Sequence, residues 1–272
     1  MKSPTKLAAI AAAAAALIAG NTSALAATPG NTVLAGDSVV ANPTVPDYWK
    51  NKANIKVNTG VGCVTDGAIA DEIANASGGA HVDQYQCAGA SFSTGGVHID
   101  NALRTAAQHG DLNPQTKNVV IVAGANDTYP YGPDVQASDR AIRDGLRNAI
   151  NIAHHHAPNA KVMVVGYPHV SFNNVSCYNS GLGSSNPLPI PAGNTAGTEQ
   201  RLQNTLREVA QQNNATFLDA WPMSEGHDAC SPDRWWVNLI DIMPPAPGNL
   251  PLHLNAHGTH AYGQFIGHNL AK

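Results

Sequence analysis

The sequence predicts an α/β protein in which helices cover both faces of a central parallel sheet of five strands, a three-layer α/β/α architecture. Two observations predict it. Five short apolar runs alternate along the chain with amphipathic helical patterns. The two central runs, "NVVIVAG" and "KVMVVGYP", are apolar continuously and not alternately, which indicates strands that are covered on both faces.

The helices are predicted from apolar residues that recur at three- and four-residue spacing. Ile142, Leu146 and Ala149 form such a stripe within the segment from Asp134 to His155. The predicted strands are Thr32 to Ala35, Val82 to Cys87, Asn118 to Ala123, Lys161 to Gly166 and Thr216 to Leu218. The predicted helices are Asp66 to Ala76, Val97 to Gln108, Asp134 to His155, a segment containing Leu202, Leu206 and Val209, and His257 to Leu270.

Two segments fit neither pattern. Ser171 to Gly197 is rich in Asn, Ser, Gly and Pro, and Met223 to Asn249 holds a proline cluster. We predict that both are long ordered loops, because each contains a cysteine that can tie it down. Trp235 and Trp236 lie in the second loop, where they either pack or line an acyl or sugar pocket.

The N-terminal segment has the pattern of a secretory signal peptide. Lys2 and Lys6 precede the apolar run Leu7 to Ala19, and Ala24 to Ala26 supplies small residues for cleavage. The run is too short to span a bilayer, which takes about 20 residues. We therefore expect residues 1–26 to be a leader and residues 27–272 to be one domain, secreted or held in the cell envelope, with no integral membrane segment.

The charge balance and the placement of the histidines argue against nucleic-acid binding and metal binding. Asp and Glu outnumber Lys and Arg by 19 to 15, and the cations are scattered, so we expect no nucleic-acid partner. His154 to His156 are consecutive, and on a helix such side chains point in different directions. They are typical of a helix C-terminus and not of a metal site. We expect neither metal nor cofactor.

The chain has four cysteines, and an exported protein meets oxidising conditions, so two disulfides are expected. Four cysteines allow three connectivities, and the sequence alone leaves the choice open. No Cys-x-x-Cys pair indicates zinc. The cysteines are Cys63, Cys87, Cys177 and Cys230.

Polar residues follow three of the predicted strands, at the sheet edge where open parallel sheets bind ligands. Gly36 to Ser38 follows the first strand, Cys87 to Ser91 the second, and Asn126 with Asp127 the third; His253 precedes the last helix. A hydroxyl, an imidazole, free backbone N–H groups and an amide are the parts of an acyl-transfer site.

These segments resemble, in order and spacing, the four sequence blocks of the SGNH hydrolases, the GDSL esterase and lipase superfamily. The blocks are Gly36-Asp37-Ser38, Gly89, Gly124-Ala125-Asn126-Asp127 and His253-Leu254-Asn255. The chain looks most like the secreted actinobacterial lipase and esterase branch. The resemblance implies a flavodoxin-like fold. It also implies pairing of Cys63 with Cys87, which leaves Cys177 with Cys230.

Residue by residue, the resemblance implies that Ser38 is the nucleophile and His253 the general base. Ser38, Gly89 and Asn126 are the implied oxyanion donors, and Asp37 orients the turn. The family usually has an aspartate three residues before the histidine, where this chain has Leu250. We expect the Leu250 main-chain carbonyl to accept from His253 Nδ1. The alternative acids are Asp228 and Asp241.

Competing residues are weaker candidates. Ser93 lacks the first glycine of a Gly-x-Ser-x-Gly elbow, and His257 and His260 lack the position before Asn255. The function predicted is that of a secreted, monomeric serine esterase or lipase acting on a lipid, glycan or small ester through an acyl-enzyme on Ser38. The alternatives are an acyltransferase with the same site and an inactive cell-envelope binding protein of the same fold.

Overall fold

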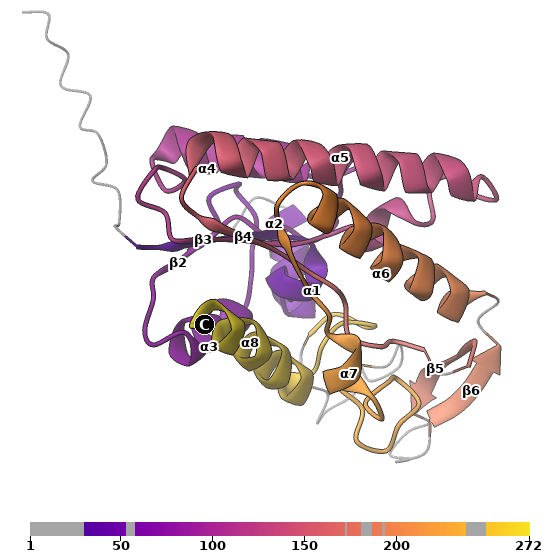
Figure 1. The fold of residues 1–272 in the computed structure, drawn as a ribbon. Helices are drawn as coiled ribbons and strands as arrows, with labels where there is room; N and C mark the ends of the chain where they lie inside the picture. The colour runs from indigo at the N-terminus through magenta and orange to yellow at the C-terminus, as the bar shows by residue number, and fades with distance from the viewer. Residues whose placement is uncertain (1–29, 53–57, 172, 181–186, 192–193, 238–248) are drawn as a thin grey trace, which may run out of the picture.

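The structure is a computed structural model that describes residues 30–52, 58–171, 173–180, 187–191, 194–237 and 249–272. The predicted leader, residues 1–26, lies outside the described residues, as does Asp241. Figure 1 shows the domain with its elements labelled.

The predicted parallel sheet of five strands is confirmed. Its strand order is β2-β1-β3-β4-β7, and every neighbouring pair is parallel. Each predicted run gives one strand, although the second ends earlier than expected. The bounds are β1 (Thr32–Gly36), β2 (Val82–Gln84), β3 (Asn118–Val122), β4 (Lys161–Val165) and β7 (Thr216–Leu218).

Helices cover both faces of this sheet, which confirms the three-layer architecture (Figure 1). The helices of one layer are α4 (Ile99–His109), α5 (Val135–His156) and α6 (Thr195–Gln212). Those of the opposite layer are α3 (Ala68–Ala76) and α8 (Ala256–Leu270). The short helices at the loops are α1 (Ser38–Ala41), α2 (Val45–Lys52), the 3-10 turn η1 (Ala125–Asp127) and α7 (Trp221–Ser224).

The core explains why the central strands are apolar along their whole length. All five residues of β3 are buried because helices pack on both of its faces. Leu146 and Ile150 of α5 are fully buried from one layer, and Ile73 and Ile266 from the other. The stripe predicted on α5 is therefore its core-facing side.

The strand order also contains a topological switch point. From β1 the chain moves outward to β2, and from β3 it moves the opposite way to β4 and β7, so the direction reverses between β1 and β3. In open α/β sheets, ligands bind beyond the carboxyl ends of the strands at such a switch point. Ser38 follows β1 and Asn126 follows β3.

One predicted loop is wrong in part. The segment 171–197 contains an antiparallel hairpin of β5 (Val175–Ser180) and β6 (Pro187–Pro191), which pairs Val175 with Pro191 and Ser180 with Pro187. The loop predicted over 223–249 has α7 at its start and isolated bridges that join Trp236 to Leu254 and Asn249 to Thr44. Residues 238–248 lie outside the described part.

Both expected disulfides are present. Cys63 pairs with Cys87 and Cys177 with Cys230, with Cα–Cα distances of 5.3 and 4.9 Å. The first anchors the segment before β2 to the segment after it. The second ties β5 to the loop that follows α7.

The double variant Cys177→Ser/Cys230→Ser is expected to unfold with a free energy lower by about 3 kcal/mol. The crosslink closes a long loop and so restricts the unfolded chain. Urea unfolding of the variant beside the oxidised wild type measures this difference. Equal unfolding free energies, with the wild-type bond verified by non-reducing peptide mapping, would contradict the expected stabilisation.

Within the described residues, no helix is both long enough and apolar enough to cross a bilayer.

Candidate active site

Ser38 stands at the sharp turn from β1 into α1. Asp37 is the N-cap of α1, and its Oδ1 accepts from Val39 N at 2.9 Å. Gly36 precedes it because a Cβ there would lie 2.7 Å from the Val122 carbonyl oxygen. Among the described residues, neither the N–H nor the Oγ of Ser38 has a hydrogen-bond partner. Both groups therefore remain available to a substrate.

Gly89 lies beside this turn. Cys87 N donates to Gly36 O at 2.9 Å, which holds the segment after β2 against the end of β1. Gly89 has φ +85°, a left-handed conformation that favours glycine. Its N–H also has no partner within the described residues.

Asn126 joins the same cluster from η1. Its Nδ2 donates to Ala90 O at 2.8 Å, and its Oδ1 accepts from Tyr129 Oη at 3.2 Å. The contact with Ala90 places the Asn126 amide next to Gly89. Because Nδ2 carries two hydrogens, the second stays available to a ligand. The structure thus brings the three predicted oxyanion donors to one sheet edge.

Asp127 holds the loop behind these donors. Its buried carboxylate accepts from Phe92 N at 2.8 Å and from Ser93 N at 3.0 Å. Ser93 Oγ also donates to it, at 3.2 Å, which gives Ser93 a structural role. The two neighbouring residues therefore have different roles. The Asn126 amide lies next to Gly89, and the Asp127 carboxylate holds the loop.

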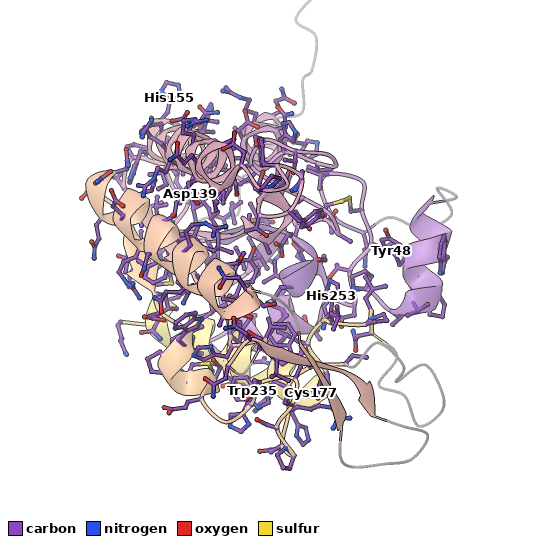
Figure 2. The ribbon with its side chains drawn as sticks, turned by 90° about the vertical axis from the view of Figure 1, so that its right-hand side faces the viewer. Tyr48, Asp139, His155, Cys177, Trp235 and His253 are labelled. Atoms are coloured by element: carbon purple, nitrogen blue, oxygen red, sulfur yellow. A yellow bond between two sulfur atoms is a disulfide. The ribbon has the colours of Figure 1, made fainter. Side chains whose placement is uncertain are left out.

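His253 lies in the segment before α8, and this segment is bonded to α1. Asn42, the C-cap of α1, donates from Nδ2 to Leu254 O at 3.0 Å, and its N–H donates to Ser38 O at 2.8 Å. One residue thus links Ser38 to the neighbour of His253. Figure 2 shows His253 on the side of the domain where α2, which carries Tyr48, projects. Within the described residues, no hydrogen bond joins His253 to Ser38 Oγ; such contacts often tighten only with substrate.

The prediction that the Leu250 carbonyl accepts from His253 Nδ1 is wrong. His253 Nδ1 lies 2.8 Å from Pro251 O, whereas Leu250 O accepts the backbone N–H of His253 at 3.2 Å and so closes a turn. Leu252 has φ +60°, and this left-handed residue turns the Pro251 carbonyl toward the ring. A carbonyl only accepts, so Nδ1 carries the hydrogen and Nε2 keeps its lone pair.

Burial lowers the pKa of His253 from its ordinary value, and the hydrogen bond to Pro251 O opposes this shift in part. The imidazole is therefore neutral at neutral pH, the form that can take a proton from a serine hydroxyl.

Sequence reasoning missed Tyr167. Its buried Oη donates to Asp37 Oδ2 at 2.5 Å and accepts from Ala125 N at 3.1 Å. It therefore fastens the turn after β1 to the turn after β3. Its position just after β4, in "GYP", could have indicated this role, because residues that follow neighbouring parallel strands lie close together at one edge of the sheet.

Burial raises the pKa of Asp37 to about 7, against the opposing hydrogen bonds from Tyr167 and Val39 N. The folded state thus holds a proton that the unfolded chain releases near its usual pKa of about 4. Protonated Asp37 therefore contributes to the free energy of unfolding. This contribution is fully present below about pH 4 and is lost as the pH rises through about 7.

We expect the unfolding free energy of Asp37→Asn to fall less than that of the wild type between pH 5 and pH 8, because the amide cannot ionise. Urea unfolding at the two pH values measures this. Asp144→Asn, a change at an exposed carboxylate on α5, serves as the control and should keep the wild-type slope. An Asp37→Asn slope equal to that of the wild type would contradict the raised pKa.

The remaining candidates are engaged elsewhere. Asp228 accepts from Cys230 N and Ser231 Oγ, each at 2.8 Å. Trp235 stacks on His227, and Trp236 is buried with Nε1 donating to His169 O, so both tryptophans pack. Among the described residues, no group of three or more His, Cys, Asp or Glu is arranged to hold a metal ion, and this includes His154 to His156.

Comparison with known proteins gives one family. The sequence model of the GDSL-like Lipase/Acylhydrolase family matches residues 34–261, which include every candidate site residue. Lipase 2 of Streptomyces coelicolor is 29% identical to this chain over 119 residues. That alignment covers 42% of this chain and 37% of Lipase 2, so the chain spans little more than a third of that relative's length.

Solved structures share the fold. An extracellular lipase from Streptomyces rimosus superposes with a TM-score of 0.60 at 18% identity, covering 89% of this chain and 99% of the lipase. Phospholipase A1 from Streptomyces albidoflavus NA297 gives 0.57 at 20% identity, covering 89% and 98%. Est24, a carbohydrate acetylesterase from Sinorhizobium meliloti, gives 0.52 at 16% identity, with the same coverage of 89% and 98%.

Proposed function

The chain belongs to the GDSL-like lipase/acylhydrolase family, and from that premise we propose that it hydrolyses carboxylic esters through an acyl-enzyme on Ser38. The observation that carries the proposal is the meeting of Ser38, Gly89 and Asn126 at the β1/β3 switch point, with the segment of His253 fastened to α1.

In the first step, Ser38 Oγ attacks the ester carbonyl carbon while His253 Nε2 takes the hydroxyl proton. The carbonyl oxygen becomes an oxyanion that accepts from Ser38 N, Gly89 N and Asn126 Nδ2. The imidazolium then gives its proton to the departing alkoxide, and an acyl ester on Ser38 remains. Water, deprotonated by the same imidazole, then attacks the acyl carbon; the carboxylic acid leaves as the imidazolium returns its proton to Ser38 Oγ.

The Pro251 carbonyl takes the place of the missing aspartate. It fixes the ring orientation and the tautomer, and its dipole favours the imidazolium that forms. A main-chain acceptor for His253 supports a catalytic role over that of an inactive binding protein, even though position 250 is a leucine.

Hydrolysis of p-nitrophenyl esters from acetate to palmitate by the oxidised protein tests the proposal. We expect release of p-nitrophenol, and the chain-length profile separates an esterase from a lipase. A correctly folded protein that cleaves no ester of the series would contradict the proposed activity.

Export is part of the proposal. The leader pattern, the two disulfides and the resemblance to an extracellular lipase support it. N-terminal sequencing of protein recovered from the culture medium should give a start near residue 27; retention inside the cell with an intact leader would contradict export.

Asn126→Ala is expected to lower kcat for ester hydrolysis by about 10²–10³-fold, because one of three oxyanion donors is lost. The assay is steady-state hydrolysis of the best p-nitrophenyl ester. Asn269→Ala is the matched control, since Asn269 also donates from Nδ2 to a carbonyl and is partly buried, but lies at the end of α8. A similar small loss in both variants would remove Asn126 from the oxyanion site.

A further inference from the structure

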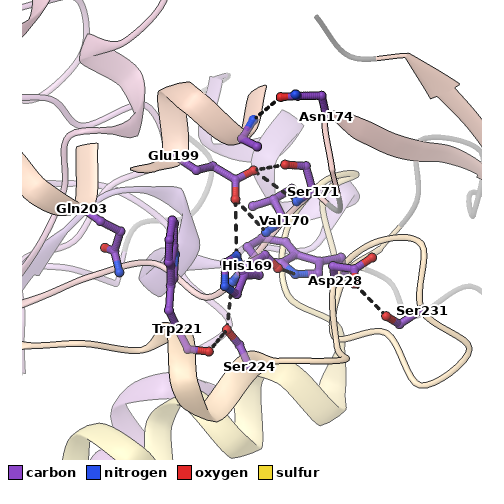
Figure 3. Close-up of polar contacts among 12 residues, drawn as sticks. His169, Val170, Ser171, Asn174, Glu199, Gln203, Trp221, Ser224, Asp228 and Ser231 are labelled. Carbon is purple, nitrogen blue, oxygen red and sulfur yellow. Dashed lines mark hydrogen bonds and ion pairs between the residues drawn. The ribbon is translucent and has the colours of Figure 1, made fainter. Parts of the chain in front are cut away.

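A cavity of about 730 Å³ opens beyond the carboxyl ends of β4 and β7. Its volume lies in the range of small-molecule sites. Its lining includes His169, which follows β4, Trp221, which follows β7, and Glu199 of α6; Figure 3 shows Glu199 next to His169 and Ser171. The residues proposed for catalysis do not line it. It lies on the same sheet edge as Ser38 but beyond different strands.

The cavity is anionic. Glu199, Glu225 and Asp228 line it, and no lysine or arginine is among its described lining residues. Within the described part of the chain, the ion-pair contact between Glu199 and a basic side chain joins its Oε2 to His169 Nδ1 at 3.8 Å. Fixed charge of one sign favours a ligand of the opposite sign.

The two carboxylates on the inner walls already have hydrogen-bond donors. Glu199 Oε1 accepts from Ser171 N at 3.1 Å and from Ser171 Oγ at 2.7 Å. Asp228 accepts from Cys230 N and Ser231 Oγ, each at 2.8 Å. These donors are neutral, so they take up part of the acceptor capacity of each carboxylate without cancelling its charge. They therefore reduce the advantage that N–H groups would give a cation here, whereas the attraction for positive charge remains.

An aromatic wall completes the cavity. The Trp221 ring stacks on the His169 ring with centroids 4.1 Å apart and an interplanar angle of 27°. Two hydrogen bonds fix the main chain of His169: its N–H donates to Ser224 Oγ at 2.9 Å, and its carbonyl accepts from Trp236 Nε1 at 2.6 Å. The face of a tryptophan combined with negative charge attracts cations, and quaternary ammonium gains from this contact without needing N–H acceptors.

We propose that this cavity binds a small organic cation bearing a quaternary ammonium group. The methyl groups contact Trp221 and His169, and the carboxylates of Glu199, Glu225 and Asp228 balance the positive charge. Binding at this site does not depend on the proposed hydrolysis at Ser38.

Titration calorimetry with choline tests the proposal, with 3,3-dimethylbutan-1-ol as the neutral isostere and ethanolamine as the cation with N–H donors. We expect saturable choline binding, at least about tenfold weaker binding of the isostere, and weaker binding of ethanolamine. Equal affinities for choline and the isostere, tighter binding of ethanolamine, or no choline binding would each overturn the proposal.

Variants locate the site. Glu225→Gln, at an exposed position on the rim, and Glu199→Gln should each weaken choline binding by about threefold or more. Glu208→Gln lies on the same helix α6 but pairs with Arg143 on the surface, so it should bind as the wild type does. If Glu199→Gln fails to fold, Glu225→Gln decides. Unchanged affinity in Glu225→Gln would overturn the assignment of the cation to this cavity.

Discussion

Replacing Ser38 with alanine is expected to lower kcat for ester hydrolysis by about 10⁴-fold or more, with little change in KM, because the acyl-enzyme can no longer form. The fold should be kept, since Asp37 still caps α1 through its contact with Val39 N. Steady-state hydrolysis of p-nitrophenyl esters, with circular dichroism of the variant, measures both points.

Ser93→Ala is the matched control for this prediction. Ser93 also follows a glycine-containing turn near the site, but its Oγ donates to the Asp127 carboxylate at 3.2 Å. It should retain most of the activity. If Ser93→Ala lost activity to the same extent as Ser38→Ala, or if a folded Ser38→Ala stayed active, the assignment of the nucleophile would be wrong.

His253→Ala is expected to cause a loss of similar size, because the serine hydroxyl then has no base. Since burial lowers the pKa of His253, wild-type kcat/KM should fall only as the pH drops below the ordinary histidine range. Hydrolysis rates of both proteins across that pH range measure the effect. The pH-dependent drop should be absent from the residual activity of the variant.

His257→Ala provides the comparison from the same helix start. The His257 ring is largely exposed and faces Asp233 at 3.9 Å. Its removal should leave kcat unchanged. A loss in His257→Ala comparable to that in His253→Ala would indicate that the base is misassigned.

The sheet and its main helices were predictable because burial on both faces requires continuously apolar strands. The continuously apolar run "NVVIVAG" indicated a strand with helices packed on both faces, and the apolar stripe on α5 indicated one of those helices. Local sequence therefore carried enough information for the layers and for the edge at which Ser38, Gly89 and Asn126 meet.

The hairpin β5–β6 was not predictable in this way. β6 contains prolines at 187, 189 and 191, and proline removes a backbone donor, so the pattern indicates a loop. The pairing of this strand depends on a partner that the local pattern does not specify, and β5 is itself tied to a distant loop by Cys177.

The hydrogen bond between His253 Nδ1 and the Pro251 carbonyl was not predicted, because it depends on the backbone conformation of the preceding turn. The acceptor is set by the turn over Leu250 to His253, in which Leu252 takes a positive φ that leucine rarely adopts. The bridge of Tyr167 to Asp37 was missed because it joins residues 130 positions apart. Both are products of tertiary packing.

Labelling with a serine-reactive fluorophosphonate, followed by intact-mass and peptide analysis, shows whether Ser38 is an activated nucleophile. The phosphonate mimics the tetrahedral intermediate and reacts only with a hydroxyl that has an active base. We expect one adduct, on Ser38, that is absent from Ser38→Ala and strongly reduced in His253→Ala. A folded, oxidised protein that takes up no label, or that carries it on Ser93, would contradict the role proposed for Ser38.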